Sequence, residues 1–195
     1  MMALAQESQE EAEEETEEVV PKLRFGCGSG EVPLPPPVYI LLIVLVTTSI
    51  VCYARISKSD AIQLKVLPSD LLAGPFGFSF GIVVGLFLLG LCVAVMMSTN
   101  KSLKQANSGI PFTPVGGIAT TGLYAHTRNP IYVAFLFCLI PSFSLFFNSA
   151  WPLVLGVPFA LYLHFCVVLV EERFLLENFG EEYEAYTESV PRWLC

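Results

Sequence analysis

Residues 129–170 read NPIYVAFLFCLIPSFSLFFNSAWPLVLGVPFALYLHFCVVLV, with no Asp, Glu, Lys or Arg among 42 residues. A helix crosses a bilayer with about 20 apolar residues, so this stretch is too long for one crossing and suffices for two. A polar break at 148–150 interrupts it, and Pro152 suits the first turn of a new helix. We therefore predict an antiparallel hairpin of two membrane spans, at about 131–147 and 151–171.

Two further uncharged stretches earlier in the chain are long enough to cross a bilayer. The first predicts a span at about 37–55, with Pro37 as its first helical residue. The second predicts a span at about 76–97. It carries three glycines four residues apart, Gly77, Gly81 and Gly85. Glycines at this spacing share one face and let a neighbouring helix approach closely, so they indicate packing.

The composition agrees with a membrane protein. Of the 195 residues, 54% are hydrophobic and only 14% are charged, whereas soluble domains carry about 25% charged residues. Eight of the eighteen acidic residues lie in residues 1–20, so the rest of the chain is neutral despite a net charge of −8. There is no basic stripe, which argues against a nucleic-acid partner.

The six cysteines are scattered without metal-ligand spacing, and we expect no metal site. The fold class we predict is all-α and polytopic, with about four transmembrane helices.

The chain divides into two parts. Residues 1–36 combine a glutamate-rich block with a segment ending in PLPPP, and we interpret them as a disordered acidic tail and a stiff Pro-rich linker. A protein-interaction or regulatory tail is the alternative. Residues 37–195 form the transmembrane domain.

The distribution of Lys and Arg predicts the orientation. With four spans, both termini and the loop 98–130 lie on one side, which carries seven basic residues near the membrane against three on the other. We therefore predict that the termini, the loop 98–130 and the C-terminal segment face the cytosol. The acidic tail favours a eukaryotic chain, and with it the endoplasmic reticulum.

Polar residues gather at the two ends of the hairpin, at 120–132 and from His164 onward. Because the start of one span and the end of the next lie close together in a hairpin, these two groups should meet. At 100° per residue, His164 and Glu171 differ by about 20° around the helix, and Glu172 follows on the same side. Ionisable groups at membrane depth are usually functional. A solvated helix end is the alternative for the two glutamates, and a structural hydrogen bond for His164.

The residues that lead into the third span are the other candidates. Arg128 can bind a carboxylate or phosphate through two parallel hydrogen bonds, or anchor the chain at the headgroups. Tyr124 and Tyr132 belong to an interfacial aromatic belt or line a pocket. From residue 173 onward, apolar residues recur at helical spacing between acidic ones: Leu175, Phe179, Tyr183, Tyr186 and Val190. This pattern predicts a C-terminal amphipathic interfacial helix, bent at Gly180.

At this point the residues match a known pattern. GLYAHTRNPIY at 122–132 is followed some forty residues later by EERFLLENFGEEYEAY and VPRW. This combination resembles the isoprenylcysteine carboxyl methyltransferase and phospholipid methyltransferase group of integral membrane enzymes. Their signature is an R-H-P-x-Y segment before one span and an E-E pair at the end of the next. The resemblance covers about residues 110–194, and the chain departs from it at Asn129, where many members have His.

The resemblance implies that S-adenosylmethionine binds in a cytosol-facing pocket made by the last two spans and the C-terminal segment. It also implies a lipid-like or prenylated acceptor that enters from the bilayer. Arg128, Glu171 and Glu172 are the expected catalytic residues. The expected cofactor-binding residues are Tyr124, His126, Arg128, Asn129, Pro130, Tyr132, His164, Glu171 and Glu172. In this hypothesis the glutamates bind the ammonium or the ribose hydroxyls of the donor, and Arg128 pairs with a carboxylate of the donor or the acceptor.

The resulting functional prediction is an S-adenosylmethionine-dependent methyltransferase that acts on the carboxylate of a C-terminal isoprenylcysteine. Methylation of a phospholipid amine or of another lipophilic acceptor is the nearest alternative. An NADPH-dependent steroid or isoprenoid reductase and a non-catalytic membrane scaffold are more distant ones.

Overall fold

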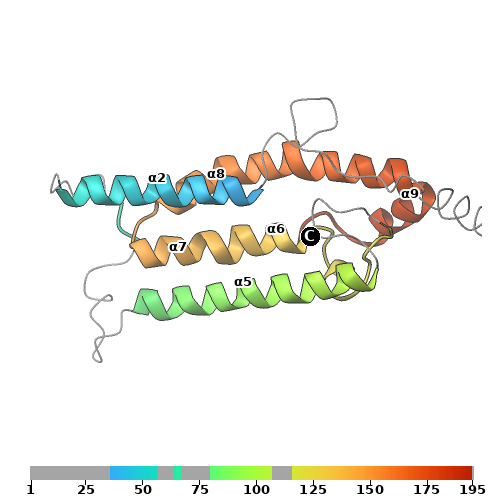
Figure 1. The fold of residues 1–195 in the computed structure, drawn as a ribbon, viewed down its shortest axis with the longest axis horizontal. Coiled ribbons are helices and arrows are strands. Elements are labelled where there is room, and N and C mark those ends of the chain that lie inside the picture. Colours follow the sequence, from blue (N-terminus) through green and yellow to red (C-terminus); the bar gives the residue numbers. More distant parts are fainter. Residues whose placement is uncertain (1–35, 57–63, 67–79, 107–115, 195) are drawn as a thin grey trace, which may run out of the picture.

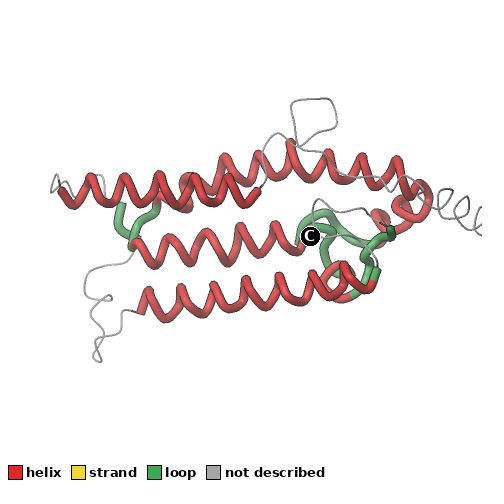
Figure 2. Tube along the Cα trace, viewed as in Figure 1, coloured by secondary structure: helices red, strands yellow, loops and turns green. Residues whose placement is uncertain are grey.

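The computed structural model describes residues 36–56, 64–66, 80–106 and 116–194, and every regular element within these ranges is a helix (Figures 1 and 2). Among these described residues, four helices are long and apolar enough to cross a membrane. The all-α, four-span prediction is therefore confirmed. The acidic tail and most of the linker, residues 1–35, lie outside the described residues.

The first two predicted spans are α2 (Pro36–Ile56) and α5 (Phe80–Gln105). α2 agrees with its predicted bounds to within a residue at each end. α5 continues beyond residue 97 to Gln105, because the polar residues that follow Met97 are also good helix formers or are tolerated in a helix at the aqueous interface. Its predicted start at 76 lies outside the described residues.

The third span is one continuous rod made of three consecutive helical segments: α6 (Pro130–Ala134), the π-helical η2 (Phe135–Leu139) and α7 (Ile140–Phe147). Pro130 takes the first helical position, where its missing N–H is not needed. The rod ends at Asn148, which has the left-handed conformation with φ 43°. The Ser144 hydroxyl donates to the carbonyl oxygen of Ser149 at 2.7 Å and closes the turn into the next helix.

The fourth span is longer than predicted. α8 (Trp151–Tyr162), the π-helical η3 (Leu163–Val168) and α9 (Leu169–Ser189) follow one another directly, and the helical backbone is broken within α9 only by a kink at Gly180. The amphipathic helix predicted from residue 173 is present, and it continues directly from the fourth span as far as the kink at Gly180. Gly180 bends it as predicted, with φ 46° and ψ −121°, a conformation that side-chain-bearing residues rarely adopt.

The helices pack in a simple order. In Figure 1, α2 lies along α8, the rod of α6 and α7 runs beside them, and α5 covers the far side of that rod. Tyr39 of α2 stacks on Phe159 and Tyr162, with ring centroids 5.2 and 5.0 Å apart. Gly85 of α5 is buried, and a Cβ built there would lie 2.6 Å from the Phe146 ring of α7. The close helix approach predicted from the glycine spacing is thus present at Gly85.

The outer faces of these helices are apolar. Leu41 and Leu45 on α2, Phe87 on α5 and Val157 on α8 are all more than half exposed. Such faces are stable against lipid tails, while the backbone hydrogen bonds stay inside each helix. Figure 1 also shows the C-terminal end of α9 turning back toward the start of α6, where the polar residues gather.

Candidate functional site

The polar site lies where the entrance to α6, the first turns of α9 and the chain segment after α9 meet. A short 3-10 helix, η1 (Gly122–Ala125), precedes this entrance and packs against α5. The predicted meeting of the two hairpin ends is therefore present in the structure.

Glu172 is at the centre of this site. Its Oε1 lies 3.0 Å from Arg128 Nη1, and its two oxygens accept from Arg192 Nε at 2.8 Å and from Nη2 at 2.6 Å. The side chains of Arg128 and Glu172 are only 13% and 15% exposed. The bond with Glu172 raises the pKa of Arg192. Two guanidinium groups share one carboxylate, so the three groups together carry one surplus positive charge.

Arg128 keeps one hydrogen-bonding group unused. Its Nε is buried and has no hydrogen-bond partner among the described residues. A buried donor without a partner costs free energy, and such groups in folded proteins usually have a bound ion, water or ligand to receive them. The position is thus suited to an acceptor group supplied from outside the chain.

Main-chain atoms hold the two sides of the site together. The amide of Arg128 donates to the carbonyl oxygen of Pro191 at 3.0 Å. The carbonyl oxygen of Arg192 accepts from Asn129 Nδ2 at 3.0 Å and from Thr127 Oγ1 at 3.2 Å. Asn129 and Thr127 are both buried. The role of Asn129 is therefore to anchor the segment after α9, which needs a donor and no titrating group.

Glu171, the neighbour of Glu172, faces a different partner. The hydroxyl of Tyr132 on α6 donates to Glu171 Oε1 at 2.7 Å, although the two residues are 39 positions apart. Tyr132 is 8% exposed, so this bond is shielded from water. The adjacent glutamates are thus differentiated: Glu172 pairs with two cations, and Glu171 binds a neutral hydroxyl.

Tyr124 of η1 lies on the same side. Its carbonyl oxygen accepts from the Tyr186 hydroxyl at 2.7 Å, which fixes η1 against α9. Burial, followed by the nearby carboxylate of Glu171, raises the pKa of Tyr124. The phenol therefore stays neutral, as a hydrogen-bonding group beside Glu171.

His164 lies in the π-helical η3 and contacts the chain end. Its Nδ1 accepts from the Trp193 indole Nε1 at 3.3 Å, and its ring meets that of Phe165 edge-on. This bond agrees with the alternative prediction for His164, a structural hydrogen bond. The prediction that His164 and Glu171 lie on one face of the helix uses the α-helical rotation of 100° per residue. Because η3 is π-helical, its turns contain more residues, and the angle between the two side chains around the helix axis is different.

Two predicted residues make no direct polar contribution. His126 is exposed at the end of η1, and within the described ranges no side-chain bond joins it to Glu171, Glu172 or Arg128. Pro130 is buried and has no N–H, so it acts only by starting α6 beside Arg128. The structure brings together Tyr124, Arg128, Asn129, Tyr132, Glu171 and Glu172, with His164 joined to the segment that closes over them.

Arg192 and Trp193 are the residues to which sequence reasoning gave no role. They lie in the VPRW segment, whose likeness to the methyltransferase group was the available signal. In the sequence, Arg192 contributes only to the count of basic residues that predicts the orientation. Its ion pair with Glu172 depends on the bend of α9 at Gly180, which a hydropathy pattern does not predict.

The site can be compared with known proteins. No curated protein and no solved structure matches the chain. A model of the phospholipid methyltransferase family matches residues 80–182, more than half of the 195 residues. This range includes Arg128, Glu171 and Glu172 but ends before Arg192. The chain therefore belongs to the phospholipid methyltransferase family, a family of membrane methyltransferases.

Proposed function

We propose that the chain transfers a methyl group from S-adenosylmethionine to the carboxylate of a prenylated cysteine that enters from the bilayer. The observation that supports this proposal is the pair of arginines on Glu172, with 3.0 Å to Arg128 and a two-point bond to Arg192. Two guanidinium groups on one carboxylate favour an anionic group beside Arg128, while the carboxylate of Glu171 balances the charge of the whole site. Arg128 Nε is the unused donor that such a group would satisfy.

The residues of the site suit S-adenosylmethionine. The carboxylate of its methionine part is the other candidate to accept from Nε of Arg128, in place of the carboxylate of the acceptor. Its ammonium or ribose hydroxyls match Glu171, since only Oε1 of that carboxylate is held by Tyr132. Tyr124 and Tyr132 offer aromatic faces next to a cationic sulfonium. Glu172 is already bound by two guanidinium groups, so we assign it to positioning these cations, and the donor's ammonium to Glu171.

When bound, S-adenosylmethionine supplies an electrophilic methyl carbon on a positively charged sulfur. The acceptor carboxylate is ionised at neutral pH, so this chain has no proton to remove. Arg128 orients a carboxylate, and Tyr132 fixes the rotamer of Glu171. The segment from Val190 to Trp193 is attached to the site by the bond from Arg128 N to the Pro191 carbonyl oxygen and by that from Trp193 to His164. Catalysis by these residues is then mostly positioning, which supplies much of the rate enhancement for a bimolecular transfer.

Methylation of a phospholipid amine is the second candidate. An ammonium acceptor must lose a proton before its nitrogen attacks, which requires a base. Glu171 is the candidate for that role, since it is half-buried, is bonded to Tyr132 and has no ion pair among the described residues. The matching family is named for phospholipid methylation, which also favours this second candidate.

The chemistry of the product separates the two candidates. Purified protein in lipid nanodiscs is incubated with S-adenosylmethionine labelled in its methyl group and either a farnesylcysteine peptide or phosphatidylethanolamine. A methyl ester releases labelled methanol in alkali, whereas a methylamine does not. We expect alkali-labile label on the farnesylcysteine peptide, and none when its carboxylate is amidated. Alkali-stable label on the phospholipid alone would replace our proposal with the second candidate.

We further propose that the site faces the cytosol and that the protein resides in the endoplasmic reticulum. The count of basic residues on the two predicted sides supports the orientation. Fluorescent fusions at each terminus test it, and a luminal signal would contradict it.

A further inference from the structure

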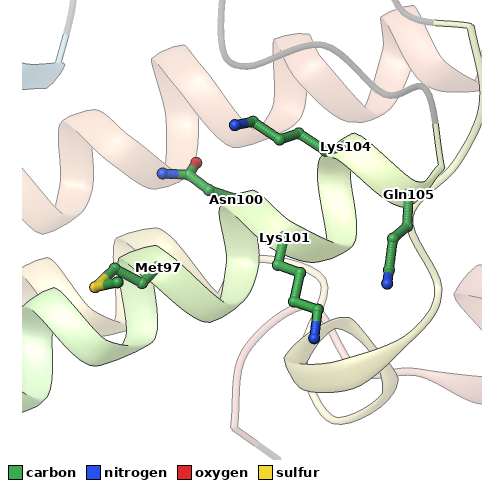
Figure 3. A pocket seen from close by; sticks show the side chains of 5 residues that line it. All are labelled: Met97, Asn100, Lys101, Lys104 and Gln105. Carbon is green, nitrogen blue, oxygen red and sulfur yellow. The ribbon is translucent and has the colours of Figure 1, made fainter.

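The C-terminal end of α5 carries a depression that the proposed reaction does not use. It has a volume of about 450 Å³ and is lined by Met97, Asn100, Lys101, Lys104 and Gln105 (Figure 3). All five residues belong to α5, and none is acidic. None of them bonds with Arg128, Glu171 or Glu172 among the described contacts. The depression is thus separate from the methyltransferase site.

The depression continues an apolar strip on the surface of α5. Residues spaced three and four apart lie on one helix face, and here they run from the bilayer to the depression: Leu86, Gly90, Val93, Met97, Asn100 and Lys104. Leu86, Val93 and Met97 are 58%, 49% and 69% exposed. A Cβ built on Gly90 would meet nothing within 4 Å. In the described part of the chain, this strip is uncovered over its whole length.

The polar end of the strip is cationic. Lys101 and Lys104 are exposed, and neither has an ion pair within the described residues. Figure 3 shows the ammonium group of Lys104 on the same side of α5 as Asn100, and that of Lys101 on the other side of the helix. Lysine stems are long enough to lie on apolar surface while the charge reaches the headgroup region. The order along the helix is therefore apolar, amide, and then ammonium.

This order matches one kind of molecule. A phospholipid places acyl chains, then glycerol esters, then a phosphate along the bilayer normal. Met97 and Lys104 are seven residues apart, about 10 Å along a helix, which spans the change from hydrocarbon to headgroup. We propose that this surface of α5 is a binding site for an anionic phospholipid, with acyl chains along Leu86, Val93 and Met97, its phosphate at Lys104, and the charge of Lys101 adding to the attraction from the other side of the helix.

Binding is measured by native mass spectrometry of the full chain in detergent, with dioleoyl phosphatidylglycerol or dioleoyl phosphatidylcholine added. A lysine near a membrane surface contributes about fivefold to anionic-lipid affinity. We expect one phosphatidylglycerol to bind about twentyfold more tightly than phosphatidylcholine. In Lys101→Gln/Lys104→Gln the preference should disappear, while circular dichroism stays unchanged because both side chains are exposed.

The matched control is Arg173→Gln, which removes one exposed positive charge from α9. It should keep the lipid preference, whereas Lys104→Gln alone should reduce it about fivefold. An equal loss in both single variants would overturn the site, because the preference would then be a general charge effect. Equal binding of the two lipids by the wild-type chain would also overturn it. Displacement of the lipid by an equal concentration of glycerol 3-phosphate would show that a free phosphate is recognised, contrary to the proposal.

Discussion

Arg192 binds Glu172 across 20 residues of sequence through two parallel hydrogen bonds, Nε to Oε1 at 2.8 Å and Nη2 to Oε2 at 2.6 Å. This geometry needs the planar fork of arginine, since the ammonium of lysine is a point charge without it. Both bonds join the segment after α9 to the helix from which it departs, and Arg128 Nη1 lies 3.0 Å from Oε1 of the same carboxylate.

We predict that Arg192→Lys weakens the binding of S-adenosylmethionine about tenfold. The variant keeps the charge but loses one of the two bonds, so Glu172 and Arg128 are held less firmly. Isothermal titration calorimetry measures the affinity. Arg173→Lys, an exposed exchange of the same kind on α9, should leave it unchanged. If Arg192→Lys bound S-adenosylmethionine with wild-type affinity, the two-point bond of the guanidinium to Glu172 would not be needed for binding.

Tyr132→Phe removes only the hydroxyl that donates to Glu171 at 2.7 Å. A hydrogen bond to a charged group contributes about 1.5–3 kcal/mol, and Glu171 loses its fixed rotamer with it. We expect donor affinity to fall by a factor of about 10 to 100 with the helices intact. Tyr53→Phe on α2 is the control, because Tyr53 is 62% exposed. Equal affinities for the Tyr132 variant and the wild type would remove Tyr132 and Glu171 from the donor site.

Asn129→Asp keeps the shape of the side chain but replaces its N–H donor with an acceptor. The new carboxylate would face the carbonyl oxygen of Arg192, now 3.0 Å from Nδ2. Because the position is buried, we expect a loss of about 2 kcal/mol in the free energy of unfolding. Thermal unfolding in detergent measures it. Asn178→Asp breaks a similar bond, to the Phe174 carbonyl oxygen, in an exposed place, and its effect should be several-fold smaller.

Gly85→Ala and Gly90→Ala form a matched pair on α5. A Cβ at Gly85 would lie 2.6 Å from Phe146, so we expect destabilisation by about 1–3 kcal/mol. A Cβ at Gly90 meets nothing within 4 Å, and Ala favours the helix, so stability should be equal or slightly higher. The midpoints of thermal unfolding give the comparison. If both variants behaved alike, the contact between α5 and α7 would have no energetic weight.

Much of this fold could be predicted from the sequence, because the bilayer sets the length of an uncharged helix. The hairpin at 129–170 follows from its length and from the break near Asn148. The antiparallel hairpin by itself predicts that Arg128, at the start of one span, lies near Glu172, at the end of the next. The C-terminal amphipathic helix also follows from the spacing of its apolar residues, and its bend lies at Gly180 as predicted. It continues from the fourth span without a break at residue 173, because no residue there stops a helix.

The closure of the site could not be predicted in the same way. The acceptors for Arg128 N and Asn129 Nδ2 are the carbonyl oxygens of Pro191 and Arg192, and every residue has a carbonyl oxygen. Side-chain patterns therefore give no sign of these bonds. The π-helical turns of η3 could not be predicted either, since a mostly apolar run such as 161–170 is compatible with both α- and π-helical turns.

This use of carbonyl oxygens has an evolutionary consequence. The docking of the last segment does not depend on which side chain stands at position 192. Docking therefore places no constraint on substitutions at that position. Selection at 192 acts on the guanidinium alone, through its partner Glu172. Lineages that exchanged this arginine while keeping the docked segment should have acquired a compensating cation elsewhere around the glutamate.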